Sequence, residues 1–408
     1  MEIIKQKNLQ QVIFAITCVF SFSLLRSRGE VDIEAWLLWI NNISEHGLIS
    51  GYIANKDMYP PFTNVIFSLV LKFSALTNIS VLVSLKLFIF GSLLITSLIF
   101  LAWTKNWLLA IAVQAGFTLN AMALSYIDIF IAPFLLISLY ALYNRNFLLF
   151  TIFYFINVMI KWQGIIILPF ILLYILNISS LKEIKNIIWG KIASQIVLPS
   201  VVLVVFVFMI FGWEVYDTFD RAMKEDMLSG YALNLSWIIT RIVYFLNPEA
   251  NFFEYGIMKI IYIKSGEISY FTKFIFFVFF FSTLIACFKE KKSFINLLKF
   301  SVIGYLIYFT FNTGVHENHL FLASLLSLLI LNYDSKFLTE AIGIMLAFNI
   351  NMFLFYGTLG DQPYIHGYFG AEISVILSAL FIIFFMMIYL PVLNILIKNF
   401  VKPKPIKT

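Results

Sequence analysis

Long apolar runs separated by short polar links constrain this chain more than any other feature. A helix needs about 20 apolar residues to cross roughly 30 Å of hydrocarbon, and it satisfies its own backbone hydrogen bonds there. About twelve runs, some of them short, are candidates for such crossings: Leu9–Leu25, Val81–Trp103, Trp107–Leu124, Ile129–Leu142, Phe147–Ile160, Gly164–Leu176, Ile192–Phe211, Phe274–Phe288, Ile295–Phe311, Leu320–Leu331, Phe337–Tyr356 and Val375–Ile397. We predict an all-α integral membrane protein with about twelve transmembrane helices in a single membrane domain, residues 1–408.

The composition agrees with a chain that lies in a lipid bilayer. Hydrophobic residues make up 61% of the 408 residues and charged residues 12%, whereas a soluble domain carries about 25% charged residues. The net charge of +6 fits basic cytoplasmic loops, so we predict no nucleic-acid partner. Cys18 and Cys287 lie in apolar runs and form neither a metal-ligand nor a disulfide pattern.

The side of the membrane on which each later loop lies depends on one further apolar run, Phe62–Leu76. This run follows "YPP" and contains Lys72. If this run does not cross, and Lys5 and Lys7 are cytoplasmic, the basic link "KEKKS" and the tail "KNFVKPKPIKT" are cytoplasmic as well. If it crosses, both face outward, against the positive-inside rule. We therefore predict that Phe62–Leu76 lies in the interface or re-enters, and that both termini are cytoplasmic.

Under this topology many of the charged residues and histidines that could bind or react with a substrate lie on the outer side of the membrane. The first outer loop contains the acidic stretch "RGEVDIEAWLLW", with Glu30, Asp32 and Glu34. Ionisable groups at a membrane boundary are ordinary when they face water, and they are a functional clue when they line a cavity. The apolar residues that follow have the i, i+3, i+4, i+7 spacing of a helix on the membrane surface: Trp36, Trp39, Ile40 and Ile43.

Two further polar positions interrupt apolar sequence. Asp128, in "SYIDIFIAPF", has almost no loop around it, and a carboxylate so close to hydrocarbon usually faces a bundle interior. Lys161, in "NVMIKWQG", has two interpretations: its ammonium extends to the lipid headgroups, or, like Asp128, it faces a bundle interior.

The link "NTGVHENH" places His316 and His319 three residues apart, on one face if the segment is helical. With Glu317 they are residue types that bind zinc. The spacing is not that of an HExxH motif and no further ligand adjoins, so we do not predict a zinc site. The fourth outer segment, "GTLGDQPYIHGYFGAE", contains His366.

These motifs, in this order, resemble the GT-C glycosyltransferases, and among them the N-glycan glucosyltransferases and the GPI-mannosyltransferase-II-like group. "GEVDIEAWLLW" followed by "MYPPFTNVIF" resembles the family's first outer loop, "YIDIF" its Gln-x-Asp segment, "KWQGIIILPF" its Lys-Pro-Gln helix and "GVHENHLFLASL" its His-Glu link. Tyr126 and Trp162 depart from the family's Gln and Pro.

The resemblance implies a GT-C fold: a catalytic module over about 1–212 with juxtamembrane helices in the loop 26–79, a large outer loop over about 213–270, and C-terminal helices over about 271–408. It implies a polyprenyl-phosphate-linked sugar donor and a glycan or glycolipid acceptor. No cofactor is predicted, although a divalent cation assists some relatives.

The resemblance also implies roles for individual residues. Asp32 is the expected general base. Asp128 is expected to orient a sugar hydroxyl or a cation, and Lys161, His316 and His319 to contact phosphate or sugar. The remaining substrate-binding candidates are Glu30, Glu34, Gln163, Arg221, Arg241 and Glu317.

Two other classes of membrane protein fit about twelve crossings. A lipid-linked-sugar flippase or transporter usually holds its site near the bilayer midplane, whereas the polar residues here collect on one side. An O-antigen polymerase or ligase relies on Arg and His of a large outer loop and does not need Asp32. The abundance of Ile, Lys, Phe and Asn favours a bacterial source, and hence the cytoplasmic (inner) membrane with a periplasmic or exterior site and an O-antigen or cell-wall glycan acceptor.

Overall fold

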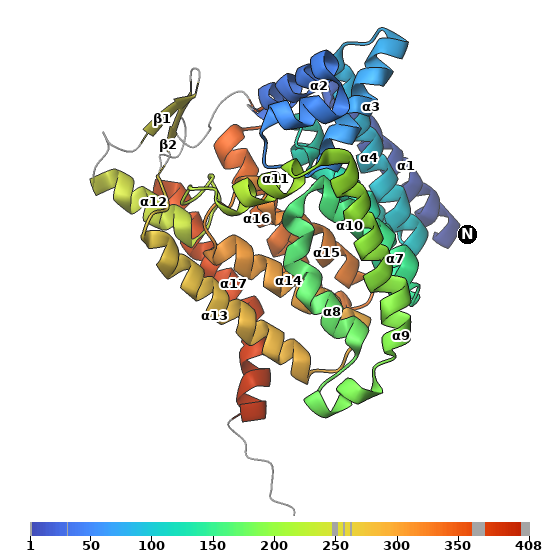
Figure 1. Ribbon diagram of the computed structural model, residues 1–408, viewed down its shortest axis with the longest axis vertical. Helices are drawn as coiled ribbons and strands as arrows, with labels where there is room; N and C mark the ends of the chain where they lie inside the picture. The colour runs from blue at the N-terminus through green and yellow to red at the C-terminus, as the bar shows by residue number, and fades with distance from the viewer. Residues whose placement is uncertain are drawn as a thin grey trace, which may run out of the picture. The chain divides into compact units, whose positions relative to one another are not determined.

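The computed structural model describes residues 2–30, 32–246, 252–255, 258–261, 263–360 and 372–400 (Figure 1). In these ranges the regular secondary structure is helical, apart from an antiparallel hairpin of β1 (Phe252–Tyr255) and β2 (Met258–Ile261) and isolated bridges of Gly230 and Tyr231 with His316. The outer segment predicted around His366 and the basic end of the tail lie outside the described residues.

Every predicted apolar run coincides with helix, which confirms an α-helical protein. These helices are α1 (Glu2–Ser23), α4 (Val81–Thr104), α5 (Trp107–Gly116), α6 (Ile131–Tyr143), α7 (Phe147–Ile160), α8 (Leu168–Leu176), α10 (Leu198–Phe211), α13 (Ile268–Lys289), α14 (Phe294–Phe311), α15 (Phe321–Leu331), α16 (Leu338–Tyr356) and α17 (Glu372–Phe400). The others are α2 (Asp32–Asn55), α3 (Pro61–Thr77), α9 (Trp189–Ile192), α11 (Glu214–Met223) and α12 (Leu235–Leu246).

Fewer helices are long and apolar enough to cross a membrane than the twelve or so predicted from the sequence. Among the described residues seven segments are long and apolar enough: Gln6–Arg26, Val81–Thr104, Trp189–Phe211, Ile268–Lys289, Phe294–Phe311, Ser335–Tyr356 and Ile373–Asn399. The other five predicted runs lie in apolar helices of 10–17 residues. The coarse prediction of an α-helical membrane protein therefore stands, while twelve crossings and the GT-C fold stay predictions.

The shorter helices end at breaks that carry polar residues. A π-helical turn, Leu119–Ala123, and a 3₁₀ turn, Ile127–Phe130, separate α5 from α6. Lys161, in extended conformation, ends α7, and the 3₁₀ turn Trp162–Ile167 leads into α8. These breaks bring backbone polar groups and side chains such as Asp128 to helix ends.

The chain divides into two compact units, which we describe separately. Unit 1 comprises Met1–Ile165, Ile188–Glu225 and Tyr356–Pro363, and unit 2 comprises Ile166–Ile187, Asp226–Phe355 and Tyr364–Thr408. In unit 2, α14 packs between α13 and α15, and α17 packs along α12 and α13. Gly304 of α14 lies so close to the Phe170 ring that a Cβ there would overlap it, so the absence of a side chain lets α8 approach.

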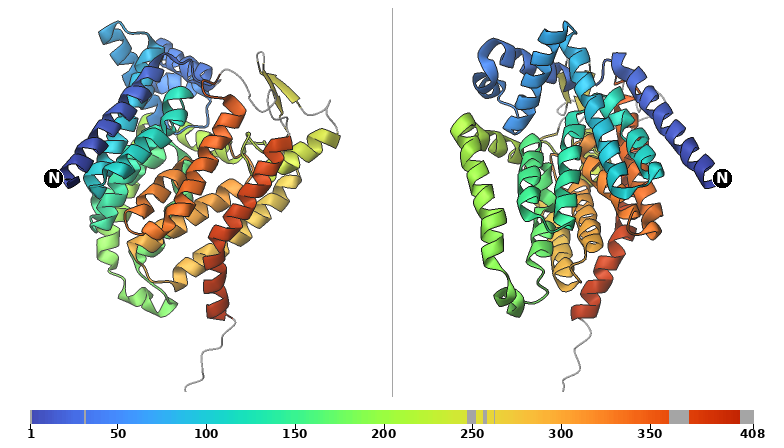
Figure 2. Two further views of the ribbon diagram at one scale, coloured as in Figure 1. Left: turned by 180° about the vertical axis from the view of Figure 1, so that it is seen from behind. Right: turned by 90° about the vertical axis from the view of Figure 1, so that its right-hand side faces the viewer.

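In unit 1, α1 packs along α5, and α2 packs against α3 (Figure 2). The predicted stripe of α2 is confirmed as a helix face, but its residues pack inside the unit: Trp36, Ile40 and Ile43 are 1–3% exposed. The Trp36 and Trp39 rings lie 6.3 and 6.4 Å from the Phe67 ring of α3. Burial of this face fixes the helix that begins at Asp32.

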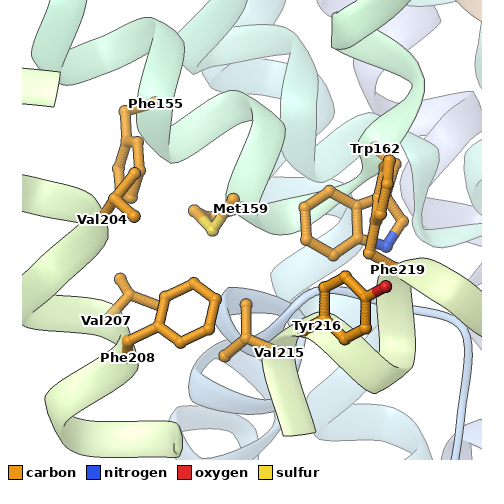
Figure 3. Close-up of a pocket in the computed structure, with 9 residues that line it drawn as sticks. All are labelled: Phe155, Met159, Trp162, Val204, Val207, Phe208, Val215, Tyr216 and Phe219. Atoms are coloured by element: carbon orange, nitrogen blue, oxygen red, sulfur yellow. The ribbon is translucent and has the colours of Figure 1, made fainter. Parts of the chain in front are cut away.

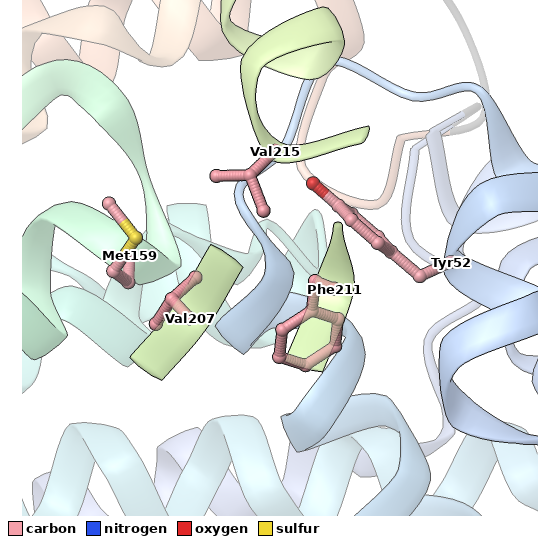
Figure 4. Close-up of a cluster of buried hydrophobic side chains, with 5 residues drawn as sticks. All are labelled: Tyr52, Met159, Val207, Phe211 and Val215. Carbon is pink, nitrogen blue, oxygen red and sulfur yellow. The ribbon is translucent and has the colours of Figure 1, made fainter. Parts of the chain in front are cut away.

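A second apolar cluster joins the far end of α2 to the helices around it (Figure 4). Its buried members are Tyr52 of α2, Met159 of α7, Val207 and Phe211 of α10, and Val215 of α11. The Tyr52 ring meets the Phe211 ring edge to face at 5.5 Å. Tyr52 also donates a hydrogen bond from its hydroxyl to Thr218 Oγ1 (2.9 Å), which attaches α11 to α2.

The segment that leads into α2 is held by a buried lysine. Lys86 of α4 is fully buried and donates from Nζ to the carbonyl oxygens of Leu24 (2.8 Å) and Ser27 (2.7 Å). Two residues before Asp32, the backbone N–H of Glu30 donates to Leu124 O (2.9 Å). The segment before the acidic stretch is thus attached to α4, and the stretch itself is attached at Glu30 to the turn that precedes Asp128.

Candidate functional site

The three carboxylates of the acidic stretch occupy three different environments. Glu30 is 2% exposed, and its Oε1 accepts the backbone N–H of Asp32 at 2.8 Å. Asp32 is half-buried in the first turn of α2, where a helix N-terminus favours negative charge. Glu34 is exposed and forms an ion pair with exposed Arg28. Of the three, Asp32 combines a fixed position with access to solvent.

Asp128 and Lys161 form a buried ion pair. Asp128 is fully buried, which confirms the predicted inward-facing carboxylate, and Lys161 is 7% exposed. The pairing excludes the interpretation in which Lys161 extends to the headgroups. Neighbouring Gln163 is also 7% exposed. Two residues 33 positions apart in sequence are therefore brought together in unit 1.

Tyr59, of the "YPP" motif, lies where these acidic groups converge. Its half-buried ring is edge-on to Trp36 at 5.3 Å, and Lys161 Nζ lies 5.4 Å from its centroid. Burial holds the pKa of the Tyr59 phenol well above its usual range, and nearby carboxylates raise it further. Those carboxylates belong to Asp128, Asp32, Asp57 and Glu30.

Asp57 belongs to this group, and the sequence analysis did not identify it. It is 5% exposed, and its Oδ1 accepts the backbone N–H of Tyr59 (2.9 Å) while its Oδ2 accepts Asn64 Nδ2–H (3.3 Å). Burial raises the pKa of Asp57 to about 7, against the opposing effect of those hydrogen bonds. The available signal was its position two residues before Tyr59 in "KDMYPP".

Arg221, a candidate from the long loop, contacts the Asp57 backbone. Its Nε donates to Asp57 O at 2.9 Å, and its Nη2 donates to Thr218 Oγ1 at 3.0 Å and is ion-paired with Glu214. The guanidinium therefore holds the segment that carries Asp57 against α11. Arg221 lies in unit 1, as do Asp32, Asp128 and Lys161.

Unit 1 also contains an apolar pocket of about 170 Å³ (Figure 3). Trp162, the residue after Lys161, lines it together with side chains of α7, α10 and α11: Phe155, Met159, Val204, Val207, Phe208, Val215, Tyr216 and Phe219. The Trp162 ring meets Phe219 edge to face at 5.2 Å, and its Nε1 donates to Met58 O at 3.1 Å. Trp162 therefore lines the pocket and also binds the segment that contains Asp57 and Tyr59.

The predicted histidines lie in unit 2. The His319 Nδ1 lies 3.2 Å from the Tyr308 hydroxyl and accepts the backbone N–H of His316 at 3.2 Å. The His316 ring lies directly against Gly230, where a Cβ would overlap it, and Glu317 is 3% exposed. Arg241, in α12, places its guanidinium 5.0 Å from the Tyr244 ring.

The described residues contain no group of three or more His, Cys, Asp or Glu side chains that could hold a metal ion. A divalent cation thus stays an open expectation.

In comparisons with known proteins, no family model and no curated protein matches the chain.

Proposed function

We propose that the protein is a membrane glycosyltransferase of the GT-C type. In this proposal it moves a sugar from a polyprenyl phosphate to a hydroxyl group of a glycan or glycolipid on the outer face of a bacterial cytoplasmic membrane. The transfer inverts the anomeric centre. Asp32 is the general base.

The observation that carries the proposal is the grouping of carboxylates and a lysine around Tyr59 in unit 1, the same unit that contains the apolar pocket. Asp32, Asp57 and Asp128 are close enough to Tyr59 to affect its phenol, and Lys161 lies beside the same ring. A lipid-linked sugar needs these three kinds of group: acids for hydroxyls, a cation for phosphate and an apolar surface for the chain.

Each group has its own role in the reaction. The acceptor hydroxyl attacks the anomeric carbon and its proton passes to the Asp32 carboxylate. The bond between that carbon and the phosphate oxygen breaks, and the electron pair leaves with the lipid phosphate. Lys161 stabilises the negative charge that develops on the phosphate. Asp128 holds the ammonium in place, and the helix that begins at Asp32 keeps the base fixed.

The pocket supports a donor with a prenyl chain. An apolar cavity of about 150 Å³ binds a molecule the size of benzene, so about 170 Å³ accommodates roughly one isoprene unit. Because Trp162 both lines the pocket and follows Lys161 in sequence, a phosphate at Lys161 would leave its first isoprene unit close to this pocket.

The test is Asp32→Asn, which is nearly isosteric but cannot accept the proton. Transfer should fall by about 100-fold or more, as for the loss of a general base, while donor binding and folding stay near the wild-type values. The measurement is the transfer rate in nanodiscs, with donor binding measured on the same sample. Glu34→Gln is the matched control, because this exposed carboxylate is paired with Arg28, and it should reduce transfer much less than Asp32→Asn.

The same assay separates the alternatives. A flippase would move the lipid-linked sugar across the bilayer without forming a new glycosidic bond. An O-antigen polymerase or ligase would form a bond but would tolerate Asp32→Asn. Near-normal transfer by that variant removes Asp32 as the base, and with it the main support for this class. The phosphate or sugar contacts expected of His316, Glu317, His319 and Arg241 stay predictions.

A further inference from the structure

The Lys161 ammonium has little access to solvent in the described conformation. Its side chain is 9% exposed, the ammonium is paired with fully buried Asp128, and the Tyr59 ring lies 5.4 Å from its Nζ. Movement of the segment that carries Tyr59 would therefore open the ammonium to a phosphate group.

The segment best built to move is Asp57–Tyr59, which we call the strap. Lys56, the residue before it, has φ = +48°, a left-handed conformation that is uncommon outside glycine. Pro60 and Pro61 follow it, and proline fixes φ and lacks a backbone N–H. The strap is thus a short segment between a turn and a stiff dipeptide, and its last residue covers Lys161.

Three hydrogen bonds attach the strap to the rest of unit 1. Asn64 Nδ2 of α3 donates to Asp57 Oδ2 (3.3 Å), and Arg221 Nε of α11 donates to Asp57 O (2.9 Å). Trp162 Nε1 donates to Met58 O (3.1 Å). Inside the strap, Tyr59 N–H donates to Asp57 Oδ1 (2.9 Å). Three of these four bonds therefore involve Asp57.

Asn64 is itself held by a row of amides. Asn42 Nδ2 donates to Asn55 Oδ1, and Asn55 Nδ2 donates to Asn64 Oδ1, both at 2.8 Å. Because the Asn64 oxygen is occupied by a donor, its amide nitrogen is directed at Asp57. The row connects α2 through α3 to the strap.

We propose that the strap is a movable cover over Lys161 and that Asp57 is its latch, so that opening exposes a cationic site for a phosphate-type anion. Release of Asp57 from Asn64 and Arg221 would free the segment between Lys56 and Pro60. The Tyr59 ring would then leave the ammonium. This proposal predicts that an anion binds at Lys161 when the strap opens. It does not depend on whether the protein transfers a sugar.

The latch makes opening depend on pH. The closed strap buries Asp57, and burial raises its pKa to about 7, whereas an aspartate in water has a pKa of about 4. The closed form therefore binds the proton more tightly, and opening is favoured as the pH rises through 7. The other ionisable groups that act on Asp57 are charged Arg221, Glu214 paired with it, and two phenols whose pKa values are raised, Tyr52 and Tyr59.

Hydrogen exchange of the strap measures this opening directly. The reporting peptide covers residues 57–63, in which Pro60 and Pro61 have no amide hydrogen, so the Tyr59 amide contributes strongly. In nanodiscs, protection corrected for intrinsic exchange should fall about tenfold between pH 6 and pH 8, the factor that linkage gives for a pKa near 7.

Two variants show whether Asp57 causes the change. Asp57→Asn keeps an oxygen for the Tyr59 N–H but does not titrate, so its protection should be the same at both pH values. Glu214→Gln removes the other carboxylate near Arg221 and should keep the tenfold change. Equal protection of the wild type at pH 6 and pH 8, or a tenfold change in Asp57→Asn, overturns the latch.

A second measurement tests the cover. Saturating farnesyl phosphate at pH 8 should lower strap protection further in the wild type and should not in the double variant Lys161→Gln/Asp128→Asn, which lacks the cation and leaves no buried unpaired charge. Unchanged protection in the wild type overturns the cover. Neither readout includes sugar transfer, so failure of the transferase proposal in its own assay leaves these results interpretable.

Discussion

Two of the ion pairs in unit 1, Arg28–Glu34 and Lys161–Asp128, differ greatly in their exposure to water. The side chains of Arg28 and Glu34 are 74% and 52% exposed, whereas those of Lys161 and Asp128 are 9% and 0% exposed. An exposed pair contributes about 0–1 kcal/mol. A buried pair has already lost its hydration, so removal of one partner leaves an uncompensated charge. Carboxylates that look alike in sequence therefore differ greatly in their effect on the fold.

The largest expected effect comes from breaking the buried pair. Lys161→Met leaves Asp128 buried without its cation and should reduce the free energy of unfolding by about 3–5 kcal/mol. The double variant Lys161→Met/Asp128→Leu should recover most of this loss, because no charge then stays buried. Thermal unfolding in detergent measures both. A loss below about 1 kcal/mol in the single variant would show that the pair behaves like an exposed one.

Asp57 provides an intermediate case, a buried carboxyl that forms no ion pair with a cation of the described residues. Because its pKa is raised to about 7, it stabilises the folded state below pH 4, and that contribution is lost as the pH rises to 7. At about 1.36 kcal/mol per pH unit, the total is at most about 4 kcal/mol. Asp57→Asn should therefore be less pH-dependent in stability than the wild type between pH 4 and pH 8. Melting temperatures over that range test this, and parallel curves for the two proteins would contradict it.

The smallest effect is expected at the exposed pair. Glu34→Gln and Arg28→Gln should each change the free energy of unfolding by less than about 1 kcal/mol, and added salt should reduce even that. Chemical denaturation at low and high salt measures it. A loss of unfolding free energy comparable to that of Lys161→Met would mean that solvent exposure does not determine how much each ion pair contributes to stability.

Sequence reasoning succeeded where a local pattern decides the structure. The ends of α7 were predicted as observed, because apolar sequence between Asn146 and Lys161 leaves little choice. The α2 stripe and the buried side chain of Asp128 also followed from spacing and context. That stripe was expected to anchor in lipid, and the structure buries it against Phe67 because α3 is available as a partner.

What the sequence could not provide depends on contacts between distant segments. Asp57 is a single acid in a polar link, and only burial together with Asn64 and Arg221 distinguishes it from a solvated residue. The contact of Gly230 with His316 joins residues 86 positions apart, and no periodicity indicates it. The number of crossings does not follow from apolar runs alone, because five of the twelve predicted runs lie in described helices of 10–17 residues, which are too short to qualify by length.

The buried lysine of α4 has a consequence for how the chain is assembled. An ammonium in a membrane helix is costly unless polar groups surround it, and those around Lys86 include the backbone carbonyls of Leu24 and Ser27. Leu24 and Ser27 follow α1 directly, so this segment is synthesised before α4, and we expect its carbonyls to accept hydrogen bonds from Lys86 while α4 inserts. Removal of residues 1–27 should lower the insertion efficiency of α4, and Lys86→Leu should restore it, in a translocation assay. Equal insertion of α4 with and without residues 1–27 would show that the carbonyls bind the lysine only after the helices have packed.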